Sequence, residues 1–206
     1  ERMMHWNDAI EQLRHEPLPR ELAIELVRRI RECSPTARTV LQFAAYLNAP
    51  FTASTLECIL SGWEESASLG KVDCHQLLKK LRSEGYLERT GDLVGGNTPT
   101  YVFKHECERL VIAGTTPRPM RHHVYGTAAQ WYALNNHDDN YDESIGDLWR
   151  SHRSYHEACR YYERAAYRAR QHGQLQKAWP LFRKLLKTLP ADCMAQRIQY
   201  SLDGAA

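Results

Sequence analysis

The sequence predicts a mostly α-helical protein with one small β-hairpin, followed by antiparallel helical repeats. First, apolar residues recur at helical spacing through most of the 206 residues. Second, residues 86–104 break this rhythm, because two short segments of strand character enclose a turn-rich tip. Third, small residues stand beside aromatic ones at helical spacing after residue 121, which lets antiparallel helices approach closely.

The composition is that of an ordinary globular protein, with 43% hydrophobic and 25% charged residues. A net charge of +2 is too small to indicate a nucleic-acid or membrane partner by itself. No apolar run approaches the roughly 18 residues of a membrane span, and no signal peptide is visible. Because the chain begins at Glu1 rather than at a methionine, we expect it to be a fragment of a longer protein.

Six cysteines are scattered along the chain without C-x-x-C spacing. This pattern indicates neither a disulfide framework nor a zinc site, and most of the positions fit buried apolar faces. A reducing, cytoplasmic setting is therefore the expected one, with attachment to a larger assembly left open.

The first part of the chain is expected to contain a lead-in and two helices. Residues 1–19 hold a weak helix over 3–14, and the next helix starts near Arg20. Its inward face is predicted to hold Leu22, Ile24, Leu26, Val27 and Ile30. Ser34 and Pro35 form a favoured N-cap and N1 pair for a helix over 36–47.

The following elements complete a small domain, which we assign to residues 20–116. Thr52 or Ser54 is predicted to cap a short helix, and Asp73 to cap a helix over 74–83 that Gly85 ends at the C′ position. Segments 86–89 and 101–104 are predicted strands around the tip. Three helices followed by a two-stranded wing is the order of a winged-helix domain, a helix-turn-helix variant.

Residues 101–112, which we call the joint, change from strand period to helix period. Tyr101 begins the strand, and Cys107, Leu110 and Val111 are predicted to share one stripe of the helix. His105 lies where the two elements meet, so its backbone is expected to be immobile. The period change makes His105 the main candidate for a functional residue.

Residues 117–206 are predicted to be a helical-repeat segment of tetratricopeptide-like type. Helices are expected over 121–134, 155–170 and 175–189, with another beginning over 144–149. Pro180 lies inside the last of them, where it removes the bond to Gln176 and should kink the helix.

Three stretches together resemble a known family. They are Leu-Pro-Arg-Glu-Leu-Ala from residue 18 with Ser-Pro-Thr-Ala-Arg-Thr-Val-Leu-Gln-Phe-Ala-Ala from residue 34, Leu-Leu-Lys-Lys-Leu-Arg-Ser-Glu-Gly-Tyr-Leu-Glu-Arg from residue 77, and Tyr-Val-Phe-Lys-His-Glu from residue 101. Their order resembles the regulatory arm of STAND-class signalling ATPases, including those fused to soluble adenylyl cyclases and some large transcriptional regulators. In that family a winged helix and tetratricopeptide-like repeats follow a nucleotide-binding module.

The resemblance implies a role for His105. In relatives the matching histidine contacts the β-phosphate of ADP bound in the neighbouring module, so ATP or ADP is expected in the parent protein and no cofactor in this fragment. Glu106 departs from the family, which has a small residue or Asp there, and the chain has no G-x-x-x-x-G-K-[ST] loop. The phosphate-binding half therefore lies outside this fragment or is absent. The alternative for His105 is a buried histidine that ties strand to helix.

Basic residues are concentrated between residues 150 and 187, where the acidic residues are Glu157 and Glu163. One interpretation is a cationic face for an acidic protein or filament partner, carried by Arg160, Arg164, Arg168, Lys184 and Lys187. The other is that these residues form the solvated outer faces of stacked helices.

The third helix of the small domain is also basic, with Lys71, Lys79, Lys80 and Arg82, as a DNA-reading helix would be. Glu84 and Glu88 follow at once, and the tip over 90–100 carries no Lys or Arg, which disfavours DNA as a partner.

Other patterns give no metal or catalytic site. Asp138, Asn140 and Asp142 imitate part of a calcium loop, but Glu143 stands where the turn requires Gly. The adjacent His122 and His123 point apart on a helix and cannot share one metal, and no catalytic motif is present. The leading hypothesis is a non-catalytic regulatory and scaffolding fragment. The alternative is a winged-helix DNA-binding transcriptional regulator.

Overall fold

A computed structural model of the chain describes residues 20–47, 50–63, 72–92, 98–135, 141–190, 193, 199–201 and 203. The described chain is mostly helical and contains a two-stranded antiparallel sheet, which confirms the predicted mostly α class with a small hairpin. The predicted helix over 3–14 and residues 93–97 of the hairpin tip lie outside the described residues.

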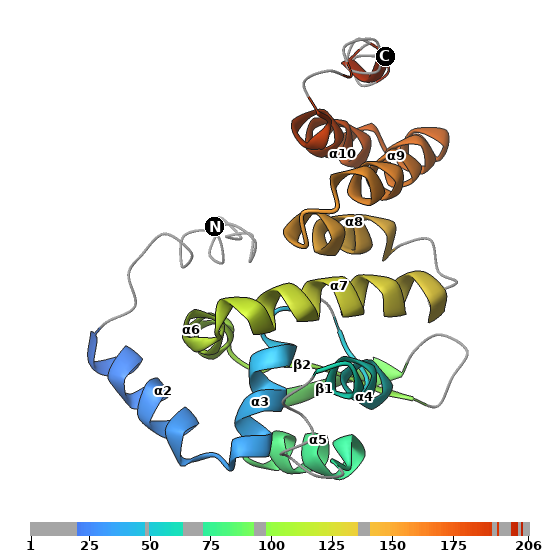
Figure 1. The fold of residues 1–206 in the computed structure, drawn as a ribbon. Helices are drawn as coiled ribbons and strands as arrows, with labels where there is room; N and C mark the ends of the chain where they lie inside the picture. Colours follow the sequence, from blue (N-terminus) through green and yellow to red (C-terminus); the bar gives the residue numbers. More distant parts are fainter. Residues whose placement is uncertain are drawn as a thin grey trace, which may run out of the picture.

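Among the described residues, the first part of the fold contains four helices and the hairpin (Figure 1). The elements follow one another in the predicted order, with boundaries close to those expected. They are α2 (Arg20–Glu32), α3 (Pro35–Ala44), α4 (Ala53–Ser61), α5 (Cys74–Ser83), β1 (Leu87–Asp92) and β2 (Pro99–Phe103).

The helix starts are set by the predicted capping residues. The Ser34 hydroxyl accepts a hydrogen bond from the Ala37 amide, and the Asp73 carboxylate accepts one from the Gln76 amide at 3.0 Å. Of the two candidates for α4, Thr52 is the cap, in a reciprocal capping box with Thr55. Each cap satisfies backbone donors that the helix itself leaves unpaired.

The sheet brings the segment before α4 into contact with the joint. Strand β1 pairs antiparallel with β2, and Leu87 lies opposite Phe103. Phe51 adds a single bridge to Tyr101, through two backbone hydrogen bonds of 3.0 and 2.8 Å. Because Phe51 and Tyr101 are both buried, this bridge lies within the core.

The second part is a stack of helices that continues from the joint. In Figure 1, α7 lies between the first part and α8, and the later helices follow in chain order. Among the last four described helices, α7 contacts α8, α8 contacts α9 and α9 contacts α10. Their bounds, with that of the joint helix α6, are α6 (Glu106–Thr115), α7 (Arg118–Asn135), α8 (Asp142–Ser151), α9 (Tyr155–Gln171) and α10 (Leu175–Thr188).

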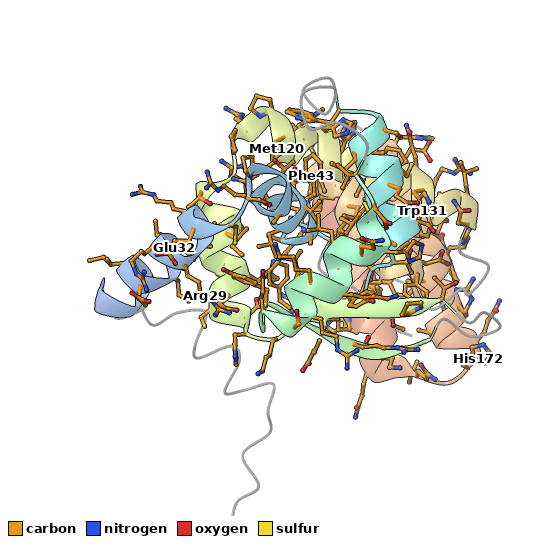
Figure 2. All side chains as sticks on the ribbon, turned by 90° about the horizontal axis from the view of Figure 1, so that it is seen from below. Arg29, Glu32, Phe43, Met120, Trp131 and His172 are labelled. Atoms are coloured by element: carbon orange, nitrogen blue, oxygen red, sulfur yellow. The ribbon has the colours of Figure 1, made fainter. Side chains whose placement is uncertain are left out.

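One hydrophobic core crosses the predicted boundary between residues 116 and 117. It extends from Ile30 through the hairpin to Leu148 in α8, and it includes Phe43 and Met120, both labelled in Figure 2. A second cluster lies between α9 and α10 around Tyr162 and Phe182. Helix α7 therefore packs as part of the first unit, through its contacts with α3 and α4.

Two predicted apolar faces are wrong in detail. On α6 the buried residues are Glu108 and Ile112, whereas Leu110 is 39% exposed. On α2, Leu26 and Ile30 are buried but Ile24 is 60% exposed. The α6 face is set by an ionic contact to α2, which apolar periodicity does not reveal.

The turn after α8 adopts a left-handed backbone conformation at a residue that is not glycine. Gly85 and Gly173 follow α5 and α9 with φ of 83° and 68°, as is usual for helix ends. Arg153 takes the same conformation after α8, with φ of 68°. A side chain there costs about 1–2 kcal/mol relative to the right-handed region.

Pro180 is accommodated inside α10, which continues on both sides of it. We expect Pro180→Ala to raise the free energy of unfolding by about 1–3 kcal/mol, because it supplies the missing amide donor to the Gln176 carbonyl and removes a ring clash. Urea titration followed by circular dichroism measures the change, with Lys177→Ala on the same exposed surface as control. Equal behaviour of the two variants would contradict the expectation.

Candidate functional site

His105 occupies the N-cap position of α6, with φ of −127° and ψ of 123°. Its imidazole is exposed and makes no capping hydrogen bond, so the alternative of a buried histidine is wrong. The backbone around it is held on both sides. The Lys104 amide donates to the Tyr86 carbonyl at 3.0 Å, and the Arg109 amide donates to the His105 carbonyl at 3.2 Å. The joint thus presents a solvent-facing imidazole on a fixed backbone.

Arg29 anchors the joint to two other elements. Its guanidinium, labelled in Figure 2, forms an ion pair with Glu108 of α6 and donates to the Glu84 carbonyl after α5. It also lies 4.2 Å from the centre of the Tyr86 ring, a cation–π contact. The Glu108 side chain is only 4% exposed, and its Oε2 atom has no hydrogen-bond partner among the described residues. This buried carboxylate was not found from the sequence.

Arg109 ties the same helix to α3. Its guanidinium donates to Glu106 at 2.8 and 2.6 Å and to the Ala45 carbonyl at 2.7 Å. Glu106, which the resemblance marked as a departure, therefore has an intramolecular partner. Arg109 thus holds α6 against α3, while Arg29 holds it against α2.

The predicted partner-binding residues Arg164 and Arg168 both face Asp142 at the start of α8. Arg164 forms an ion pair with this carboxylate, and Arg168 donates to it at 2.9 Å. The Asp142 side chain is 2% exposed. Asp138 and Asn140 of the calcium-like pattern lie outside the described residues, whereas the oxygens of Asp142 bind guanidinium groups.

The other three predicted residues differ in their surroundings. Lys184 of α10 binds Glu143 at 2.8 Å and Asp147 at 2.7 Å, and so joins α10 to α8. Arg160 pairs with Glu157 on its own helix at 3.0 Å, and Lys187 is exposed. The acidic partners on α8 precede residue 150, outside the stretch where the positive charge is concentrated. Arg164, Arg168 and Lys184 thus link helices of the stack, while partner binding by the five stays a prediction.

The adjacent histidines of α7 have separate environments. His123 Nε2 lies 2.8 Å from the Ile59 carbonyl, whereas the His122 ring is centred 4.2 Å from that of His152 after α8. Burial lowers the pKa of His152, and the charge of His122 lowers it further. Within the described part of the chain, no group of three His, Cys, Asp or Glu side chains is placed to hold a metal ion.

No protein-family model, curated protein or solved structure matches this chain. Function therefore rests on geometry and on chemistry.

The cysteines offer little chemistry. Among the described residues they form no disulfide, and only Cys74 is fully buried. The other five are half-buried, and of these Cys33 and Cys159 pack against the two core clusters, so the prediction that most lie on buried faces holds only in part. Burial raises the pKa of the Cys74 thiol to about 12, and this keeps it protonated and unreactive at neutral pH. Among the described helices, none has the length and apolar character to cross a bilayer.

Proposed function

We propose that this chain is a non-catalytic regulatory and scaffolding segment of a larger STAND-like ATPase or cyclase-associated signalling protein. In this proposal residues 20–116 act as a winged-helix domain and residues 117–206 as tetratricopeptide-like repeats. The observation that carries it is the exposed imidazole of His105 on a joint that the Arg29–Glu108 ion pair and the Arg109–Ala45 hydrogen bond fix to α2 and α3.

The order of elements supports the proposed architecture. Helices α3, α4 and α5 precede the β1–β2 hairpin, as in a winged helix. After the hairpin, small residues let neighbouring helices approach one another closely. Gly146 of α8 lies against the Tyr162 ring of α9, and a Cβ atom at Gly146 would lie 2.8 Å from it. Close packing of successive helices of this kind is typical of stacked repeats.

The proposed mechanism is conformational. His105 would donate a hydrogen bond to a phosphate of ATP or ADP in an adjoining nucleotide-binding module, as an imidazole can at neutral pH. The contacts of Glu108 and Arg109 would pass a displacement of the joint to α2 and α3. Since α7 and α8 share the core of the first part, the repeats would move with it. Arg160 and Lys187 would then contact an acidic protein or filament partner.

The test uses the longer protein that carries this chain next to its nucleotide-binding module. Calorimetric titration with ADP should show binding at least about tenfold weaker in His105→Ala than in the wild type, which corresponds to a charge-assisted hydrogen bond. His75→Ala is the matched control, because His75 is an exposed histidine on α5. An unchanged ADP affinity in His105→Ala would remove the sensing role.

DNA binding remains the second candidate, because α5 exposes Lys79, Lys80 and Arg82. Of these three cations, Lys80 alone has an ion-pair partner among the described residues, Glu84 at 3.7 Å. Fluorescence anisotropy with duplex DNA at increasing salt separates the two functions, because phosphate-driven binding weakens steeply with salt. Salt-sensitive binding that Lys79→Ala and Arg82→Ala abolish would favour the DNA regulator over the scaffold.

A further inference from the structure

A cationic hollow lies between the first half of α7 and the turn after α8. It has a volume of about 370 Å³, within the usual range for small-molecule sites of about 300–1,000 Å³. Among the described residues, its lining contains three exposed arginines and no acidic residue. The lining residues, which we call the arginine hollow, are Arg118, Arg121, His122, Tyr125, Ser151 and Arg153.

Two elements build the arginine hollow from opposite sides. Arg118, Arg121 and Tyr125 fall at positions i, i+3 and i+7 of α7 and so share one face of that helix. Ser151 and Arg153 come from the end of α8 and the turn after it. The site therefore exists only because α7 and α8 pack together.

Arg121 lies beside two phenol side chains, of which that of Tyr125 is half-buried and that of Tyr46 is buried. Burial raises the pKa of Tyr46 and of Tyr125, and the nearby charge of Arg121 acts in the opposite direction on both hydroxyls. The Tyr46 and Tyr125 rings are in edge-to-face contact, with centroids 5.4 Å apart. Tyr125 thus adds an aromatic ring and a hydroxyl group to the lining of the hollow, and the Tyr46 ring packs behind it.

The three arginines differ from other cations of the helical stack in their partners. In the part of the chain that the structure describes, no carboxylate forms an ion pair with Arg118, Arg121 or Arg153. Arg168 and Lys184, by contrast, bind acidic residues of α8. Three like charges that line one hollow repel one another unless an anion lies between them.

The backbone adds a second, independent observation. Arg153 holds the left-handed conformation that Gly85 and Gly173 occupy after α5 and α9. Glycine would fill this position without a steric cost, so the arginine is placed at the hollow against the local backbone preference.

From these observations we propose that the arginine hollow binds a phosphate-type oxyanion of a small soluble molecule, with inorganic diphosphate as the simplest ligand. Each guanidinium offers a planar fork of N–H donors that matches two phosphate oxygens. The hydroxyl of Tyr125 can supply a further donor, whereas the Ser151 hydroxyl already donates to the Asp147 carbonyl at 2.8 Å. The site shares no residue with the joint, so it goes beyond the function proposed above.

The test is calorimetric titration of the full chain with inorganic diphosphate, at an ionic strength held constant with sodium chloride. We expect one site on the wild type and at least about tenfold weaker binding in Arg153→Gly, since this variant removes a charge-assisted contact. Its thermal midpoint should be no lower than that of the wild type, because glycine suits the left-handed turn. Arg183→Gln, an exposed cation of α10, is the control and should bind like the wild type.

Other outcomes would overturn the proposal. Absence of diphosphate binding to the wild type would exclude the site. Equal affinity in wild type and Arg153→Gly would show that the binding lies elsewhere on the surface. If the chain co-sediments with vesicles of phosphatidylcholine and phosphatidic acid but does not bind diphosphate, the arginines of the hollow bind a lipid surface instead. Each of these results leaves the ADP test of His105 unaffected, so the two proposals fail separately.

Discussion

Replacing Arg29 with methionine is expected to lower the free energy of unfolding by about 3–5 kcal/mol. The Glu108 side chain is 4% exposed and has Arg29 as its ion-pair partner. Its Oε2 atom already lacks a hydrogen bond among the described residues, so the variant would leave a buried carboxylate without compensation. Urea unfolding followed by circular dichroism, with the same slope assumed for both proteins, gives the difference.

A second substitution separates the ionic contact from simple packing. Glu108→Gln in the Arg29→Met background should recover much of the lost stability, because a neutral amide is less costly to bury than a charge. Arg28→Met is the matched control on the same helix, since Arg28 pairs with the exposed Glu25 and Glu32 and should matter little. Equal losses of unfolding free energy in Arg28→Met and Arg29→Met would show that the buried ion pair contributes no more to stability than the exposed one.

Tyr162→Ala is the second substitution with a large expected effect, also a loss of about 3–5 kcal/mol. The ring is fully buried between α8, α9 and α10 and lies against Gly146, where no side chain could be fitted without displacement. Lys184 Nζ lies 5.7 Å from the ring centre, and the hydroxyl donates to Asp147 at 2.6 Å. Removal of the ring would leave a cavity at the centre of the second core cluster.

The conservative variant divides this loss into two parts. Tyr162→Phe keeps the ring and gives up one hydrogen bond, so we expect a loss of about 1 kcal/mol. Thermal unfolding of the two variants under one set of conditions measures the contrast. A Phe variant as unstable as the Ala variant would mean that the hydroxyl, rather than the ring, holds α8 and α9 together.

The helix starts could be predicted from the sequence because each depends on a few neighbouring residues. Ser34, Thr52 and Asp73 accept hydrogen bonds from amides three positions along the chain, and Gly85 supplies a left-handed residue next to the helix it ends. The joint could also be predicted, because the change from strand period to helix period occurs within a few adjacent residues.

The ionic contacts that fix the site could not be predicted in the same way. Glu108 is buried because of Arg29, 79 positions earlier, and Asp142 because of Arg164 and Arg168, 22 and 26 positions later. Periodicity assigns a Glu or Asp to solvent by default, and only a tertiary partner reverses that assignment. The same limit applies to the arginine hollow, whose two sides meet only when α7 and α8 pack.

The core that runs from Ile30 to Leu148 determines how this chain can be divided during evolution. A recombination event between residues 116 and 117 would separate Val124 and Ala128 of α7 from Phe43 and Ile59, and both products would carry a bare apolar face that favours aggregation. The smallest inheritable module therefore includes α7 and α8. Helices can be gained or lost only beyond the turn at Arg153, where the second cluster begins.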